Sequence, residues 1–246
     1  MALLTLTDVY KSFGGVKAVD GVSMRVEKGE IIGLIGPNGA GKTTLVNIIS
    51  GFYKPDRGEI LFNGSDVTTK PPYIRAKLGI ARTFQNPRLV SNMTALLNVA
   101  YAVLGREDAK NMSLYEAVAE AIYYLDLVGL LRRRDVLAKD MPLYELRLLE
   151  LARALALRPK LLLIDEVMAG LNPAEAEKVR KLIINIKEQL DLTIIWIEHV
   201  LKLVMKTVDR VVVMHYGKII AEGSPKEVAE NPVVIEAYTG KRMVAI

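Results

Sequence analysis

A glycine-rich segment near the amino terminus has the residue types and spacing that hold phosphate groups. Residues 36–43 read GPNGAGKT and fit the pattern G-x-x-x-x-G-K-[ST]. The preceding IIGLI predicts a buried strand and the following TTLVNIIS a helix start, which is the context that this pattern requires. Glycines let several backbone N–H groups face one concavity, and a helix amino terminus adds positive potential there. The segment therefore predicts polyphosphate binding, with a chance glycine-rich turn as the alternative.

The side chains of this loop have separate expected roles. Lys42 can reach the outer phosphates of a nucleoside triphosphate, and the Thr43 hydroxyl can bind Mg²⁺. We expect the whole segment to contact the phosphates: Gly36, Pro37, Asn38, Gly39, Ala40, Gly41, Lys42, Thr43 and Thr44.

Acidic residues follow a second apolar run. LLLID, residues 161–165, predicts a central strand with Asp165 at its carboxyl end, where ligands bind in open α/β sheets. That carboxylate can hold Mg²⁺, and Glu166 can orient or deprotonate an attacking water, although such a pair is otherwise more often a helix cap. LTIIWIEH predicts a further strand that ends in His199. A neutral imidazole there can contact the γ-phosphate or the water; a lone histidine is otherwise usually structural.

The elements that must position these residues indicate an α/β protein. Residues 3–84 predict strands and turns around the loop, residues 88–157 predict helices, and residues 160–246 alternate between strands and helices. Apolar strands that alternate with helices indicate a parallel sheet covered on both faces. We expect one domain, with a core of about 1–87 and 158–246 and an inserted helical subdomain.

Composition supports a folded chain without a membrane span. The 246 residues are 51% hydrophobic and 25% charged, which is ordinary for a globular protein. There is no cysteine, so a disulfide framework and a thiolate metal site are excluded. We read no signal peptide and no apolar run of about 18 residues, so we expect any membrane role to be peripheral. The net charge of +5 identifies no partner.

Together these motifs resemble those of the ATP-binding cassette (ABC) ATPases, the motor subunits of ABC transporters, over essentially the whole chain. The resemblance implies a P-loop NTPase (RecA-like) core with a mixed sheet, an antiparallel β-subdomain and an inserted α-helical subdomain, binding ATP and Mg²⁺. It places Phe13 of SFGG where the family stacks an aromatic ring on adenine. It places Gln85 of TFQN at the Q-loop, which senses Mg²⁺ and water, and His199 at the switch histidine. The D-loop, which crosses to a partner subunit, falls on Ala169, Gly170, Leu171 and Asn172.

Finer features resemble the ATPases of branched-chain amino acid importers: ARTFQNPRL with MTALLNV, then AGLNP, then the ending NPVVIEAYTG. Urea importers and lipopolysaccharide exporters share several of them and stay as alternatives. The resemblance implies an ATP hydrolase held at the cytoplasmic face of the membrane by a transmembrane permease, served indirectly by an extracytoplasmic solute-binding protein. Cassette proteins of DNA repair or translation are the competing class. They usually carry long coiled-coil insertions or two cassettes, neither of which is present, and we expect no nucleic acid partner.

The family signature, which resembles L-S-G-G-Q or L-S-Y-G-E-Q, falls on MPLYEL, residues 141–146. Pro142 stands at the serine and Tyr144 at the second glycine, with Leu143 and Glu145 beside them. In the family this helix start closes over the γ-phosphate of ATP held by the other subunit. Pro142 offers neither a hydroxyl nor an N–H, and Tyr144 adds bulk where clearance is needed.

A site closed by this segment should be at least about a hundredfold slower, because one oriented donor is worth about 2.7–4 kcal/mol in a transition state. We therefore expect a heterodimer, in which a second ABC ATPase subunit supplies the intact signature, rather than a homodimer. A regulatory ATP binder with little turnover is one alternative. The other alternative is that the departures from the family signature were engineered into the sequence or are a sequence artefact.

Overall fold

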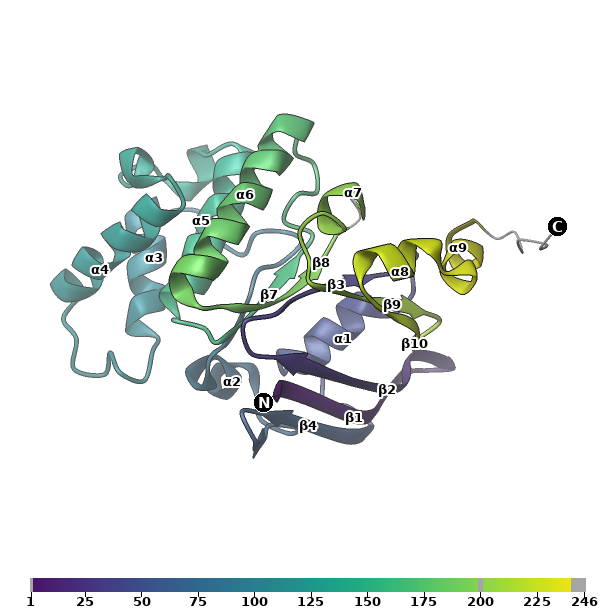
Figure 1. The fold of residues 1–246 in the computed structure, drawn as a ribbon. Coiled ribbons are helices and arrows are strands. Elements are labelled where there is room, and N and C mark those ends of the chain that lie inside the picture. The colour runs from purple at the N-terminus through teal and green to yellow at the C-terminus, as the bar shows by residue number, and fades with distance from the viewer. Residues whose placement is uncertain (1, 199–200, 240–246) are drawn as a thin grey trace. The chain divides into compact units, whose positions relative to one another are not determined.

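The chain forms two compact units in the computed structural model (Figure 1), which describes residues 2–198 and 201–239. One unit comprises Met1–Pro72 and Thr193–Ile246 and is called the phosphate-loop unit below. The other comprises Tyr73–Leu192 and is called the helical unit.

The phosphate-loop unit contains an antiparallel sheet with the strand order β2-β1-β4-β5. Its strands are β1 (Ala2–Phe13), β2 (Val16–Glu27), β4 (Arg57–Phe62) and β5 (Ser65–Asp66). Along the second half of β2, buried Val22, Met24 and Val26 alternate with exposed residues. This alternation is typical of an antiparallel sheet with one face against the core.

The same unit contains parallel strands that carry the loop (Figure 1). Strand β3 (Ile31–Ile35) pairs in parallel with β8 (Thr193–Ile197) and β9 (Arg210–His215). Strand β10 (Lys218–Gly223) pairs antiparallel with β9, so this sheet is mixed, as expected. Every residue of β3 and β8 is buried, which explains their continuous apolar sequences.

Helix α1 (Lys42–Ile49) follows β3 and buries Leu45, Val46, Ile48 and Ile49. The short helices α7 (Leu201–Val204), α8 (Pro225–Glu230) and α9 (Pro232–Thr239) belong to the later part of this unit.

The helical unit packs α3, α4 and α5 against one another (Figure 1). Its helices are α2 (Pro72–Leu78), which starts at the end of the other unit, α3 (Ala95–Leu104), α4 (Leu114–Leu127), α5 (Leu143–Ala156) and α6 (Pro173–Leu190). Short 3₁₀ helices lie at Leu131–Arg133 and Ala138–Asp140. The apolar face expected for α5 is confirmed: Leu148, Leu151, Ala152 and Leu155 are buried.

Two strands of the helical unit lead to predicted site residues: one ends in Asp165, and the other ends three residues before Gln85. Strand β6 (Ile80–Arg82) pairs in parallel with β7 (Leu161–Asp165). Because parallel strands end at the same edge, Asp165 and the residues after Arg82 lie close together.

Candidate functional site

The glycine-rich loop between β3 and α1 is closed in by backbone from two sides. A Cβ on Gly36, whose φ is 150°, would lie 2.1 Å from the Met214 carbonyl oxygen in β9. A Cβ on Gly41, whose φ is 101°, would lie 2.1 Å from the Ala18 carbonyl oxygen in β2. Both positions therefore require glycine, for conformation and for space.

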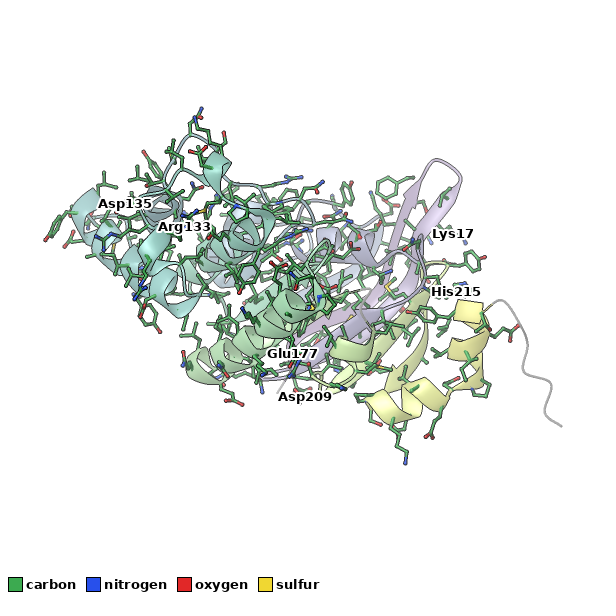
Figure 2. All side chains as sticks on the ribbon, turned by 90° about the horizontal axis from the view of Figure 1, so that it is seen from above. Lys17, Arg133, Asp135, Glu177, Asp209 and His215 are labelled. Atoms are coloured by element: carbon green, nitrogen blue, oxygen red, sulfur yellow. The ribbon has the colours of Figure 1, made fainter. Side chains whose placement is uncertain are left out.

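The β9–β10 hairpin is bonded to the same loop. The Gly217 N–H donates to the Ala40 carbonyl at 3.0 Å, and the Gly217 carbonyl accepts from the Asp20 N–H at 2.8 Å. Figure 2 labels His215 of this hairpin and Lys17 of β2, and a Cβ on Gly217 would lie 2.8 Å from the Lys17 carbonyl oxygen. The curl of the loop is thus held by residues distant in sequence.

The loop presents one buried cation and an exposed hydroxyl. Lys42 is 6% exposed, and its ammonium donates to the carbonyls of Gly36, at 2.7 Å, and Pro37, at 3.1 Å. Thr43 is exposed and Thr44 is half-buried. Gly41 is the N-cap residue of α1 and makes no side-chain capping bond, so the first N–H groups of the helix can bond an anion.

Two exposed aromatic rings meet in the phosphate-loop unit. Phe13, at the end of β1, lies in a T-shaped contact with Tyr53, with 5.2 Å between ring centroids. An exposed ring of this kind can stack on a nucleobase. Tyr53 was not predicted as a site residue; the sequence signal for it is an aromatic residue only four positions after α1 ends.

In the helical unit, the predicted metal ligand Asp165 is paired with a buried arginine. The Asp165 carboxylate accepts from the Arg82 guanidinium at 3.0 Å, and both side chains are buried. The Asp165 N–H also donates to the Thr83 hydroxyl at 3.2 Å. Sequence reasoning missed Arg82, because the contact depends on the β6–β7 register and joins residues far apart in the chain.

The predicted catalytic residues Gln85 and Glu166 are brought together. The Gln85 amide nitrogen donates to the Glu166 carboxylate at 2.7 Å. Glu166 is 8% exposed and adopts a φ of 51°, which is uncommon for a residue with a side chain. The third predicted catalytic residue, His199, lies outside the described residues.

The signature segment forms the start of α5. Pro142 is the N-cap residue and makes no side-chain capping bond, although its carbonyl accepts from the Leu146 N–H at 3.0 Å. Leu143 is 40% exposed and Tyr144 is half-buried, with its pKa raised by burial and by the charge of Glu175. Glu145 pairs with Arg133 at 2.9 Å. This helix start therefore carries bulky side chains and no hydroxyl at its cap.

Arg147 of α5 joins three segments of the helical unit. Its guanidinium donates to the carbonyls of Phe84 and Gln85 and, at 3.3 Å, to that of Ala169. The predicted D-loop and Q-loop are thus both bonded to the signature helix by one buried arginine, which was not predicted as a site residue.

The predicted D-loop residues occupy the turn before α6. Gly170 has a φ of 80°, and a Cβ there would lie 3.0 Å from the Leu143 side chain. Asn172 caps α6, because its side chain accepts from the N–H groups of Ala174 and Glu175. Asn172 thus has a structural role in this chain, which is independent of any partner.

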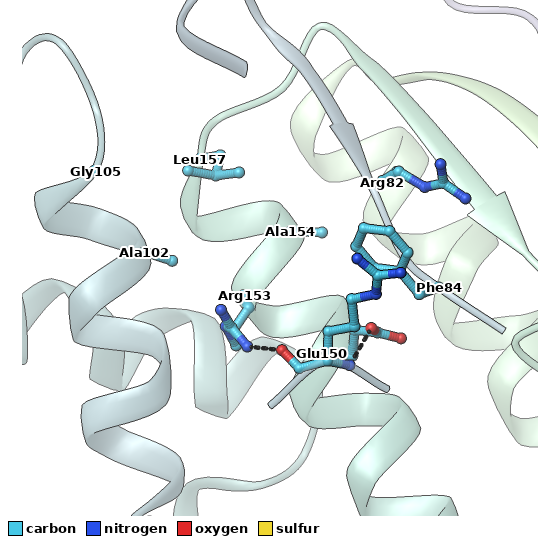
Figure 3. Close-up of a pocket in the computed structure, with 9 residues that line it drawn as sticks. Arg82, Phe84, Ala102, Gly105, Glu150, Arg153, Ala154 and Leu157 are labelled. Carbon is cyan, nitrogen blue, oxygen red and sulfur yellow. Dashed lines mark hydrogen bonds between the residues drawn. The ribbon is translucent and has the colours of Figure 1, made fainter. Parts of the chain in front are cut away.

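A pocket of about 260 Å³ lies in the helical unit (Figure 3). Phe84 lies between two guanidinium groups, those of Arg82 and Arg88, each 4.4 Å from the ring centroid. Burial raises the pKa of Glu150, whose carboxylate accepts from the Arg88 N–H at 3.0 Å. The pocket is lined by Arg82, Phe84, Arg88, Ala102, Gly105, Glu150, Arg153, Ala154 and Leu157.

Each unit by itself offers oxygen donors that suit Mg²⁺ bound chiefly through phosphate and water. No cluster of three or more histidine or acidic side chains suited to a metal occurs among the described residues. Thr43 in the phosphate-loop unit and Gln85 and Asp165 in the helical unit offer oxygen ligands, which Mg²⁺ prefers, and it commonly uses one or two such groups with substrate phosphates. Within the described ranges, no helix has the length and apolarity to cross a bilayer.

These features are those of an ATP-binding cassette, and the chain belongs to the ABC transporter family, whose sequence pattern it matches over residues 19–169. Residues 218–243 also match the pattern described as branched-chain amino acid ATP-binding cassette transporter. The mixed α/β architecture is therefore that of the P-loop NTPases.

Known proteins resemble the chain along nearly its full length. The high-affinity branched-chain amino acid transport ATP-binding protein BraF of Pseudomonas aeruginosa is 37% identical over 250 residues, covering 97% of this chain and 98% of BraF. A crystal structure of an ABC transporter cassette in its ADP conformation has a TM-score of 0.85 and 35% identity, covering 98% of this chain and 100% of that one. A dimeric cassette in a post-hydrolysis state, bound to ADP and phosphate, has a TM-score of 0.80 and 25% identity, covering 90% and 98%.

Proposed function

We propose that this chain is the ATP-hydrolysing subunit of a branched-chain amino acid transporter. The observation that carries the proposal is the loop in which Gly36 and Gly41 admit no side chain while Lys42 lies buried above the loop carbonyls. The match of residues 218–243 and the likeness to BraF support the branched-chain substrate class. A urea importer or a lipopolysaccharide exporter is the alternative.

In this proposal the loop binds the phosphates of ATP. Lys42 exchanges its bonds to the loop carbonyls for bonds to the outer phosphates, because an ammonium gains more from anionic oxygens than from neutral ones. Phe13 stacks on the adenine. Bound Mg²⁺ supplies positive charge to the phosphates, and Thr43, Gln85 and Asp165 would hold it.

Hydrolysis is assigned to Glu166 and Gln85. Glu166 accepts a hydrogen bond from the attacking water and aligns it, and Gln85 fixes the orientation of the Glu166 carboxylate. His199 is proposed to contact the γ-phosphate. The ion pair with Arg82 keeps the Asp165 side chain oriented before the nucleotide arrives.

The start of α5 supports a heterodimer. A signature helix closes a partner's site in this family, and Pro142 and Tyr144 make a poor closing surface. A second ABC ATPase with an intact signature would complete the site on this chain, whereas a homodimer would have two impaired sites. The dimeric cassette that resembles this chain supports pairing as such.

The test is steady-state ATP hydrolysis by this chain alone and mixed with a second cassette subunit from the same transporter. We expect the mixture to be at least about a hundredfold faster per active site, since the partner restores an oriented donor. Full activity of the chain alone would refute the heterodimer.

The degenerate signature also favours a second function, a regulatory ATP binder with little turnover. Single-turnover hydrolysis with excess protein separates the two. The transport subunit converts bound ATP to ADP in the presence of its partner, whereas the regulatory binder retains ATP under the same conditions.

The pocket beside Phe84 is the proposed docking site for a transmembrane permease, which would hold the chain at the cytoplasmic face of the membrane. Arg82 and Arg88, which lie over the Phe84 ring, and the buried Glu150 offer charged groups for this contact. Co-purification with a permease after mild detergent extraction tests the assignment. A Phe84→Ala variant should lose the permease, and the surface variant Tyr115→Ala should retain it.

A further inference from the structure

The segment after α1 is tied to the strand that carries Phe13. The Asp56 carboxylate accepts from the Lys11 ammonium at 2.7 Å and from the Ser12 N–H at 2.7 Å. In addition, the Asp56 N–H donates to the Tyr10 carbonyl at 2.8 Å. Three hydrogen bonds therefore join Asp56 to Tyr10, Lys11 and Ser12, the last residues of β1 before Phe13.

The same segment also remains attached to the helix of the phosphate loop. The Tyr53 N–H donates to the Asn47 carbonyl of α1 at 3.1 Å, and Pro55 is buried. Residues 53–56 thus connect the helix that follows the phosphate loop to the strand end at Phe13.

The Phe13 ring is oriented from two directions although it is 44% exposed. Tyr53 contacts it with an interplanar angle of 66°, and the Lys11 ammonium lies over the ring, 5.6 Å from the centroid. Edge-to-face and cation–π contacts of this kind favour one ring orientation over the others. A ring already held in its binding orientation loses less conformational freedom when a ligand stacks on it.

We propose that Tyr53 and Asp56 are positioning residues for the nucleobase: Tyr53 sets the tilt of the Phe13 ring, and Asp56 sets the position of the strand end that carries it. The inference rests on the proposed function, in which Phe13 stacks on adenine. It assigns base affinity to residues outside the phosphate loop, and it makes base binding separable from phosphate binding.

The experiment compares two ligands on the full chain, ATP and inorganic tripolyphosphate, which has the phosphates but no base. Dissociation constants are measured by titration without hydrolysis, in EDTA. Tyr53→Leu should weaken ATP roughly three- to tenfold, the range expected for an edge-to-face aromatic contact. Asp56→Asn, which removes the charge that pairs with Lys11, should weaken ATP up to about fivefold, the range expected for an exposed ion pair. Both variants should bind tripolyphosphate within about twofold of the parent chain, because the loop is unchanged.

Two matched controls accompany these variants. Tyr53→Phe keeps the ring and should bind ATP as the parent does. Tyr115→Leu makes the same type of change at an exposed tyrosine of α4 and should have no effect. Unfolding midpoints of all variants confirm that each chain is folded at the assay temperature.

A double-mutant cycle distinguishes positioning of Phe13 from a general structural role. In a Phe13→Leu background, Tyr53→Leu should weaken ATP by less than about twofold, since the ring that Tyr53 orients is absent. Equal weakening of ATP and tripolyphosphate, or an undiminished Tyr53 effect in that background, would overturn the inference. Failure of Lys42→Ala to weaken tripolyphosphate would instead overturn the proposed function, so the two failures are distinguishable.

Discussion

The starts of helices α1 and α5 resemble each other in one respect and differ in what surrounds them. Helices α3, α4, α6 and α8 begin at residues whose side chains cap the backbone, whereas α1 and α5 do not. An uncapped start leaves N–H groups for a ligand. At α1 the preceding loop has glycines and the helix begins with the buried Lys42; at α5 the cap is Pro142, followed by Leu143 and Tyr144.

This difference supports the proposal that the chain retains one half of an ATP site. The residues proposed to bind the chain's own nucleotide have the types that phosphate chemistry requires. The residues proposed to close a partner's nucleotide offer no hydroxyl at the helix cap and carry bulky side chains. Most of residues 147–156 of α5 are buried, so the helix itself is intact, and the departure from the family signature is confined to its start.

The largest expected effect is at the start of α1. Lys42→Ala removes the ammonium that is buried over the phosphate loop and should weaken Mg·ATP binding at least about a hundredfold, because hydrogen bonds to charged groups are worth about 1.5–3 kcal/mol each. Equilibrium dialysis measures the change. Lys226→Ala, an exposed lysine of α8, is the control. Retained affinity in Lys42→Ala would remove the basis of the comparison.

The next effect separates binding from hydrolysis. Glu166→Gln should bind ATP as the parent does and hydrolyse it about 10²–10⁴ times more slowly with the partner present, because an amide is a poor base. Rapid-quench measurement of bound ADP checks this outcome. If hydrolysis persisted at the parent rate, the role given to Glu166 would be wrong, while the role of Lys42 would stand.

A restored signature sharpens the comparison directly. The double change Pro142→Ser with Tyr144→Gly supplies the hydroxyl and the clearance that α5 lacks. Hydrolysis by the chain alone should rise about a hundredfold, since an oriented donor contributes about 2.7–4 kcal/mol in a transition state.

The rate of ATP hydrolysis by the double variant alone, without a partner subunit, measures the effect of the restored signature. Tyr123→Gly, which introduces glycine at an exposed position of α4, should give no gain. If the double variant were as slow as the parent, Pro142 and Tyr144 would not be what limits ATP hydrolysis by the chain alone.

The smallest effect concerns the buried part of α5. Burial raises the pKa of Glu150, so the folded state keeps a proton that the unfolded state releases above the ordinary glutamate pKa. The contribution of Glu150 to folding stability therefore falls as the pH rises from the ordinary glutamate pKa to the raised pKa of the folded state. Glu150→Gln should show a smaller loss of unfolding free energy between pH 4.5 and pH 8, measured by urea titration.

Glu188→Gln, at an exposed position of α6, is the control for this measurement and should follow the parent chain. A Glu150→Gln curve parallel to that of the parent would contradict the effect of burial. It would leave the comparison between the two helix starts unchanged.

Much of the fold could be predicted because its signals are local. The apolar runs IIGLI, before Gly36, and LLLI, before Asp165, predict buried strands, and both strands are buried along their whole length. The helical face of α5 could be predicted from its spacing alone. The last two helices, α8 and α9, were not predicted individually, since each is short and its apolar pattern is weak.

The amino-acid sequence by itself determined the phosphate loop, the acidic strand end and the altered signature, because each is set by neighbouring residues whose conformation is decided within a few positions. Only the tertiary structure decided the partners of those residues. Arg82 meets Asp165, Gln85 meets Glu166, and Tyr53 meets Phe13 across long intervals of chain. Such contacts depend on strand register and on the path of connecting segments, which the packing of the whole core fixes and no local spacing encodes.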